Sequence, residues 1–441
     1  MQVVIIGGGI SGIATAIRLR EFLGTKVDIT ILEKKGAPGG VWRDSLWPGA
    51  GVDVPIHLYS LYSDLSPDWS EVFASQPEVL AYWNGLIEKH KLEDCFRFNS
   101  EFLGSAWQEG LQRHAVRVRN PLTGSEQVLQ ANILVSAAGP LAAPRLPKIP
   151  GVETFKGDWF HNLQWNPAVE LKGKRIAVIG NGSSGIQLID KEWAARTLAA
   201  GKGRREEEAR LLTYLRETAP EKYLPALTPN YPLGTKRTAL DLGWLASLHR
   251  ENVELVNTPI THVRPEGIET ADGQLREHDV IIYATGADVA WEGVGVNRQV
   301  FGEDGQELRA YWESLGGPQA YAGLAVPHSR TIAKIVKAPR TAPFAEQNAR
   351  IQEALRTSAA ASTATNNWWR TDTGRITVVN PLRGRELRRS AAHQPRWADW
   401  KATRGGEVID VAAIERERQR KVAGIVLVVL VALWLLFLVA V

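Results

Sequence analysis

Gly7, Gly9 and Gly12 have the spacing of a loop that brings backbone N–H groups against a pyrophosphate. In such a loop the first glycine allows a tight turn, the second lets the phosphates approach the backbone, and the third lets the next helix pack closely on the strand. Glu33 lies about 20 residues further on, where a carboxylate can bind both ribose hydroxyls. Because a carboxylate there repels a 2′-phosphate, the pattern predicts FAD or NAD.

A second loop has the same spacing, and it is formed by Gly180, Gly182 and Gly185 with Ser183 and Ser184 before the last glycine. No acidic residue at the end of a following strand accompanies it, and the next stretch is polar and basic. The alternative is a structural copy of the first loop without a ligand. Two dinucleotide-binding units in one chain predict one bound flavin and one nicotinamide donor.

The surrounding sequence predicts the elements that position these loops. Short β-branched runs at 2–6 and 27–32 flank a helical stretch at 13–22, which is typical of a βαβ unit, and a second unit opens at Lys174. The proline-rich stretch 140–151 is interpreted as a linker. We therefore expect an α/β fold with two Rossmann-like dinucleotide-binding domains. The expected organisation is an FAD-binding domain, first part, at 1–140, a shortened NADP-binding domain at 141–286, a return to the FAD domain at 287–415 and a transmembrane tail anchor at 422–441.

Four further motifs resemble those of one family of enzymes. Gly39-Gly40-x-Trp42, Trp47-Pro48-Gly49 and Asp53 resemble the flavin-side fingerprint of class B flavoprotein monooxygenases. Phe155-x-Gly157-x-x-x-His161-x-x-x-Trp165 is similar to the signature of the Baeyer–Villiger members, and Ala284-Thr285-Gly286 is similar to the motif that closes their nicotinamide domain. Pro232-x-Gly234-x-Lys236-Arg237 resembles the segment that supplies the family's active-site arginine. The resemblance covers most of residues 1–400.

The resemblance implies roles for individual residues. Arg237 would stabilise an anionic flavin–oxygen intermediate, and Asp53 would orient Arg237; a guanidinium keeps its charge when it is buried, which suits this role. Lys236 would face the 2′-phosphate of NADPH. The fingerprint residues would couple the movements of the two domains without taking part in bond formation; the alternative for His161 is an ordinary hydrogen-bonded histidine of the core. The flavin would be held by Gly7, Gly9, Gly12, Glu33, Gly40, Trp42 and Asp53, and NADPH by Gly180, Gly182, Ser183, Ser184, Gly185 and Lys236.

The sequence departs from the family pattern in two places that affect function. Only 50 residues separate Gly185 from Lys236, and the strand that carries a phosphate-binding arginine in the family is not found there. Arg204 and Arg205 lie nearby, but in a charged run that is typical of a solvated helix face. The basic segment 328–343 does not resemble the family's glycine-containing flavin loop. The choice of NADPH over NADH is therefore left open by the sequence.

Composition narrows the class of protein. The chain has 441 residues, of which 44% are hydrophobic and 23% charged, as in globular proteins. Lys plus Arg total 52 and Asp plus Glu 48, so no strong field for a polyanion exists and nucleic-acid binding is not expected. Cys95 is the one cysteine, which excludes an intramolecular disulfide and favours a reducing compartment. No metal site is expected.

The last 20 residues, 422–441, are all apolar, long enough for a helix to cross a bilayer core of ~30 Å. Basic residues at 416–421 precede them, so we expect a single-pass C-terminal anchor with the catalytic part facing the cytosol, as in the endoplasmic reticulum if the source is a eukaryote. A buried C-terminal helix is the alternative.

These observations favour an FAD-dependent, NADPH-using monooxygenase that uses O2 to insert oxygen into a ketone, with a lipophilic small molecule as substrate. The alternatives are an enzyme that oxygenates nitrogen or sulfur, an uncoupled NADPH oxidase, and a nucleotide-binding remnant without activity.

Overall fold

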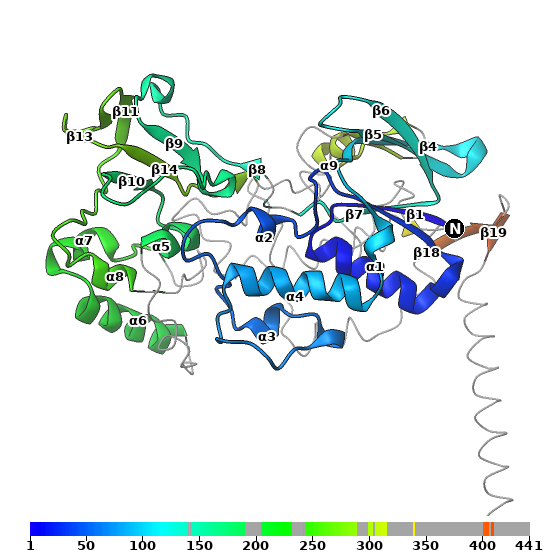
Figure 1. Ribbon diagram of the computed structural model, residues 1–441, viewed down its shortest axis with the longest axis horizontal. Coiled ribbons are helices and arrows are strands. Elements are labelled where there is room, and N and C mark those ends of the chain that lie inside the picture. Colours follow the sequence, from blue (N-terminus) through cyan, green and yellow to red (C-terminus); the bar gives the residue numbers. More distant parts are fainter. Residues whose placement is uncertain are drawn as a thin grey trace, which may run out of the picture.

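The computed structural model describes residues 1–139, 141, 143–189, 204–231, 241, 243–288, 299–302, 305–314, 338–339, 400–404 and 407–409. Figure 1 shows two lobes side by side, each built on a small parallel sheet. Within the described residues no helix is both long and apolar enough to cross a membrane. The predicted span at 422–441 lies outside them.

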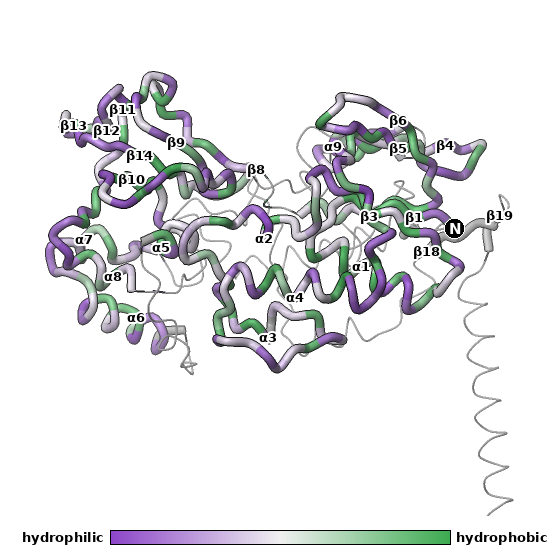
Figure 2. The backbone as a smooth tube through the Cα atoms, in the orientation of Figure 1, coloured by the Kyte–Doolittle hydropathy of each residue, from purple (hydrophilic) through white to green (hydrophobic). Residues whose placement is uncertain are grey.

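A four-stranded parallel sheet forms the centre of the first lobe, with the strand order β3-β2-β1-β7. Its strands are β1 (Gln2–Ile6), β2 (Asp28–Leu32), β3 (Phe96–Arg97) and β7 (Ile133–Ser136). The four residues from Val3 to Ile6 are all buried, because both faces of this sheet are covered. Figure 2 shows β1 as hydrophobic. With α1 (Ile10–Leu23) between β1 and β2, the βαβ unit predicted from the sequence is confirmed.

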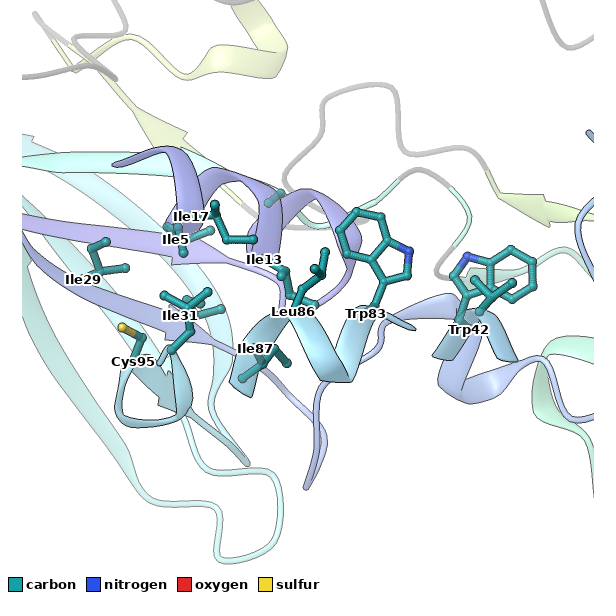
Figure 3. Packing of buried hydrophobic residues seen from close by; sticks show 14 of the residues in the cluster. Ile5, Ile13, Ile17, Ile29, Ile31, Trp42, Trp83, Leu86, Ile87 and Cys95 are labelled. Carbon is teal, nitrogen blue, oxygen red and sulfur yellow. The ribbon is translucent and has the colours of Figure 1, made fainter. Parts of the chain in front are cut away.

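Two different layers cover this sheet. On one face α1 and α4 (Gln76–Lys89) pack against Ile5 and Ile31, and Figure 3 shows Trp83, Leu86 and Ile87 of α4 in this core. On the other face lies a second sheet of order β16-β4-β5-β6, which buries Val116 and Val118. Its strands are β4 (Glu101–Gln108), β5 (Arg113–Arg119), β6 (Glu126–Ala131) and β16 (Gln299–Phe301). The short helices α2 (Val41–Asp44) and α3 (Ile56–Tyr59) precede α4.

The second lobe has a three-stranded parallel sheet of order β10-β14-β9. Its strands are β9 (Asp158–His161), β10 (Ile176–Ile179) and β14 (Val280–Tyr283), and α5 (Ser183–Ile189) follows β10. An antiparallel sheet lies beside it, made of β11 (Ile260–Arg264), β12 (Gly267–Thr270) and β13 (Leu275–Glu277). The second unit, predicted to open at Lys174 with a strand at 175–179, is thus confirmed.

The two parallel sheets differ at one edge. In the first lobe β2 flanks β1 on the side away from β7, whereas among the described residues no strand pairs with β10 on the side away from β14. Instead α6 (Arg204–Thr218), α7 (Leu224–Leu227) and α8 (Trp244–Ser247) follow in the chain. They form a core with Ile186 of α5 that includes Ala219, Trp244, Leu245 and Leu248. The charged run at 201–210 is interpreted from the sequence as a helix face, and its described part, from Arg204 on, belongs to α6.

The chain passes between the lobes twice at one place. There β8 (Ala143–Pro144) pairs antiparallel with β15 (Ala287–Asp288). The Arg145 N–H donates to the Gly286 carbonyl at 3.0 Å, and the Thr285 hydroxyl donates to the Arg145 carbonyl at 2.6 Å. After this crossing, β16 joins the sheet of β4, so the chain returns to the first lobe. The described remainder is α9 (Leu308–Ser314), β17 (Ala338–Pro339), β18 (Trp400–Arg404) and β19 (Glu407–Ile409).

Candidate functional site

The first glycine loop leads from β1 into α1 and has no room for side chains. Gly7 has φ +105°, and a Cβ on it would lie 2.5 Å from the Ala137 carbonyl oxygen. A Cβ on Gly12 would lie 2.0 Å from the carbonyl oxygen of Gly7, so only glycine lets α1 start this close to the strand. Contacts within the protein are therefore enough to require glycine at two of the three positions, without any ligand. The third, Gly9, faces Gly40.

Glu33 follows β2 and points back at this loop. Its carboxylate accepts the Gly8 N–H at 2.9 Å and the Lys35 N–H at 2.9 Å, and the residue is 6% exposed. Each carboxylate oxygen has a second lone pair, so both can also accept a hydroxyl. The strand end thus brings the predicted ribose-binding carboxylate next to the phosphate-binding loop.

The segment Gly39-Gly40 closes over the first loop. The Gly39 N–H donates to the Gly8 carbonyl at 3.0 Å, and a Cβ on Gly40 would lie 2.8 Å from the Gly9 Cα. Trp42 on α2 is buried, its indole N–H donates to the Tyr59 hydroxyl at 2.8 Å, and the two rings meet edge to face. Trp42 therefore holds α2, and with it the backbone of Gly40, against the loop.

The second loop repeats the first. Gly180 has φ +115°, and its Cβ would lie 2.4 Å from the Ala284 carbonyl oxygen, while a Cβ on Gly185 would lie 2.1 Å from the Gly180 carbonyl oxygen. At Gly182 a Cβ would meet no described atom within 4 Å, so this position is free to face a ligand. Ser183 and Ser184 begin α5. The geometry supports a second dinucleotide-binding unit.

One repeat was missed in the sequence. Ala137-Ala138-Gly139 follows β7 as Ala284-Thr285-Gly286 follows β14, and the first alanine of each triplet abuts the first glycine of its loop. The signal was available, because both triplets come directly after a buried strand. The predicted motif at 284–286 therefore has a counterpart in the first lobe.

Asp53 lies between the two lobes. Its carboxylate accepts the hydroxyl of Ser183, at the start of α5, at 3.2 Å. Asp53 thus connects the segment after α2 with the second glycine loop. Lys236 and Arg237, the predicted donor-binding and catalytic cations, lie outside the described residues, so their roles stay predictions.

The four fingerprint residues lie around the edge strand β9: Phe155 and Gly157 precede it, His161 ends it, and Trp165 follows the next turn. Phe155 is buried in the core of the second lobe, and a Cβ on Gly157 would lie 2.3 Å from the Asp279 carbonyl oxygen. Trp165 packs edge to face on Phe160. The 3-10 turn Asn162–Gln164, between His161 and Trp165, lies against both α2 and β8. The fingerprint therefore touches the flavin-side helix and the crossing between the lobes, which fits the predicted coupling role.

His161 at the end of β9 is 1% exposed. Its Nδ1 accepts the Leu163 N–H at 3.1 Å, and Nε2 makes no hydrogen bond within the described part of the chain. Burial lowers the pKa of His161, and the nearby backbone of Gly286 opposes this effect only in part. The ring is therefore neutral at pH 7, with Nδ1 as the acceptor and the proton on Nε2.

The two glycine loops, one in each lobe of the α/β fold, are typical of an oxidoreductase that binds two dinucleotides. A family model described as pyridine nucleotide-disulphide oxidoreductase matches residues 1–199. A Baeyer-Villiger monooxygenase of Streptomyces coelicolor is 31% identical in an alignment that covers 73% of this chain and 70% of that protein. An FAD-binding monooxygenase of Aspergillus niger is 28% identical in an alignment that covers 90% of this chain and 81% of that protein.

Solved structures agree on the fold. A steroid monooxygenase bound to NADP superposes with a TM-score of 0.77 at 23% identity, over 92% of this chain and 100% of that one. The closed form of cyclohexanone monooxygenase gives 0.76 at 20% identity, over 92% and 99%. The chain belongs to the class B flavin-dependent monooxygenases, the family that contains the Baeyer–Villiger enzymes. The resemblance drawn from the motifs is thereby confirmed at the level of the family.

Proposed function

We propose that this protein is an FAD-dependent, NADPH-using monooxygenase that inserts one oxygen atom of O2 into a lipophilic ketone. Ketone, O2, NADPH and one proton give an ester or lactone, NADP+ and water. The observation that carries the proposal is the arrangement of two glycine loops joined by residues 47–53, with the fingerprint turn against α2. The fit to a flavin rests on the first glycine loop at the start of α1 and on the buried Glu33 carboxylate beside it, which keeps lone pairs for ribose hydroxyls.

The two glycine loops would each bind one dinucleotide. The first loop, with the N–H groups that open α1, would hold the FAD pyrophosphate, and Glu33 would accept the ribose hydroxyls. Gly180, Gly182 and Gly185 would hold NADPH in the same way. Bound FAD supplies the redox chemistry, accepting hydride from NADPH and activating O2. The protein's part is to position the two dinucleotides and to place charge beside the reacting oxygen.

Asp53 and Arg237 would control that charge. A ketone is attacked by an anionic oxygen nucleophile, whereas amines and sulfides require the protonated, electrophilic form. A permanent guanidinium at Arg237, oriented by Asp53, favours the anionic form and therefore the ketone reaction.

The test is to incubate the full-length chain with NADPH under 18O2, once with a long-chain ketone and once with a matched sulfide, and to identify the oxygenated products by mass spectrometry. An ester carrying one 18O atom supports the proposal. A sulfoxide without ester would identify the sulfur-oxygenating alternative. Hydrogen peroxide equal to the NADPH consumed, without either product, would identify an uncoupled oxidase.

We also propose that residues 422–441 anchor the chain in a membrane with the flavin-binding part in the cytosol. The support is their unbroken apolar composition and the basic flank before them. Alkaline carbonate should leave the full-length chain in the membrane pellet and release a chain that ends at residue 421. Extraction of both would refute the anchor.

A further inference from the structure

The side chain of Gln187 spans the boundary between the two lobes. It lies on α5, one turn after Ser183, and is 7% exposed. Its Nε2 donates to the Gly51 carbonyl at 3.0 Å, and its Oε1 accepts the Trp47 indole N–H at 3.2 Å. Both ends of one amide are therefore bonded to a segment of the other lobe.

The backbone of the opposing segment is shaped around this residue. A Cβ on Gly49 would lie 2.4 Å from the Gln187 carbonyl oxygen, and Gly49 has φ +80°. The Trp47 side chain is 8% exposed. The sequence Trp47-Pro48-Gly49 therefore places an N–H donor and a residue without a side chain where α5 approaches.

The same segment is fixed on its other side to the flavin-side lobe. The Val52 N–H donates to the Ala74 carbonyl at 3.1 Å, and the Gln76 N–H donates to the Ala50 carbonyl at 2.9 Å. Residues four apart on a helix share a face, so Ser183 and Gln187 both face this segment. Ser183 bonds to Asp53, and Gln187 bonds to Trp47 and Gly51. A rigid connection thus runs from the start of α4 through residues 47–53 to α5.

We propose that Gln187 is a positioning residue that holds the nicotinamide-binding loop at a fixed place relative to the flavin-side segment. This inference rests on the proposed function. Gln187 would act through its bonds to Trp47 and Gly51, which fix the place of α5. Its loss should slow hydride transfer more than it weakens binding of either dinucleotide.

The test compares Gln187→Met with Gln130→Met in the full-length chain. Gln130 is a partly buried glutamine on β6, in the second sheet of the first lobe, and belongs neither to residues 47–53 nor to a glycine loop. Both substitutions exchange a glutamine for a methionine of similar volume. Gln187→Met should slow anaerobic bleaching of the flavin at saturating NADPH about tenfold or more, with the Kd for NADP+ within threefold. In Gln130→Met the bleaching rate should stay near that of the unmodified chain.

A second readout does not require the reaction. Amide hydrogen exchange at residues 50 and 52 should accelerate about tenfold in Gln187→Met and less in Trp47→Phe, which leaves the bond from the Gln187 Nε2 to the Gly51 carbonyl in place. The double variant should exchange no faster than Gln187→Met, because that single change already removes both bonds. Unchanged exchange at these amides, or additive effects in the double variant, would overturn the proposal even if the flavin were absent. Failure of the unmodified chain to bleach would instead count against the proposed function. If the unmodified chain bleaches and Gln187→Met bleaches equally fast, the positioning role is refuted.

Discussion

Replacing the last glycine of each loop by alanine should separate the two nucleotide sites. In Gly185→Ala the new Cβ would lie 2.1 Å from the Gly180 carbonyl oxygen, well inside the closest contact a Cβ makes. To reach about 3.0 Å, α5 must move by roughly 1 Å, at the cost of about 1–3 kcal/mol that is typical of overpacking. If the displaced loop loses the same free energy in donor binding, the Kd for NADP+ rises about 5- to 150-fold.

The matched change in the first lobe is Gly12→Ala, whose Cβ would lie 2.0 Å from the Gly7 carbonyl oxygen. This variant should lose FAD, whereas Gly185→Ala should remain yellow. Gly85→Ala is the control, because its Cβ meets no described atom within 4 Å in the interior of α4. It should raise the free energy of unfolding by about 0.5–1 kcal/mol.

The assays are the ratio of flavin to protein absorbance and the titration of flavin-loaded protein with NADP+. The reasoning would be refuted if Gly185→Ala bound NADP+ as tightly as the unmodified chain. It would also be refuted if Gly185→Ala lost flavin while Gly12→Ala kept it, since the two loops would then serve the opposite cofactors.

Three further predictions concern stability. In Gly157→Ala a Cβ 2.3 Å from the Asp279 carbonyl oxygen should push β9 off its neighbour and lower the free energy of unfolding by about 1–3 kcal/mol, measured by urea denaturation. Burial lowers the pKa of His161, so the contribution of the neutral ring to the free energy of unfolding should be complete above pH ~6.5 and fall as the pH drops toward the folded-state pKa. In His161→Asn the free energy of unfolding should depend less on pH over this range. An unchanged pH dependence would contradict the assignment of this effect to His161. Burial alone would raise the pKa of Asp64, but hydrogen bonds, first that of Lys89 at 2.8 Å, hold the pKa well below its usual range. Asp64→Asn should therefore lower the free energy of unfolding by about 1–3 kcal/mol at pH 7. The difference between the two proteins should shrink below pH ~4, where the stabilisation by the Asp64 carboxylate is lost.

The sequence was most informative where a local pattern determines local structure. Apolar β-branched runs followed by glycines identified β1 and β10, and the spacing of Gly7, Gly12 and Glu33 predicted contacts that the structure contains. These contacts depend on residues within one βαβ unit, so their spacing alone constrains them.

Contacts between distant segments could not be predicted in the same way. The hydrogen bonds from α5 to residues 47–53 join positions about 130–140 apart in the chain. Nothing in the local pattern around Gln187 distinguishes it from any polar helical residue. The linker expected at 140–151 also contains a short strand, β8, whose pairing with β15 depends on how the lobes meet.

The most direct test of the account is anaerobic mixing of the purified full-length chain with NADPH while the absorbance of oxidised flavin is followed. We expect a yellow protein that NADPH bleaches rapidly, because both loops are formed and are held together through residues 47–53. A yellow protein that NADPH cannot bleach would contradict the donor site in the second lobe, and a colourless protein would contradict the flavin site itself.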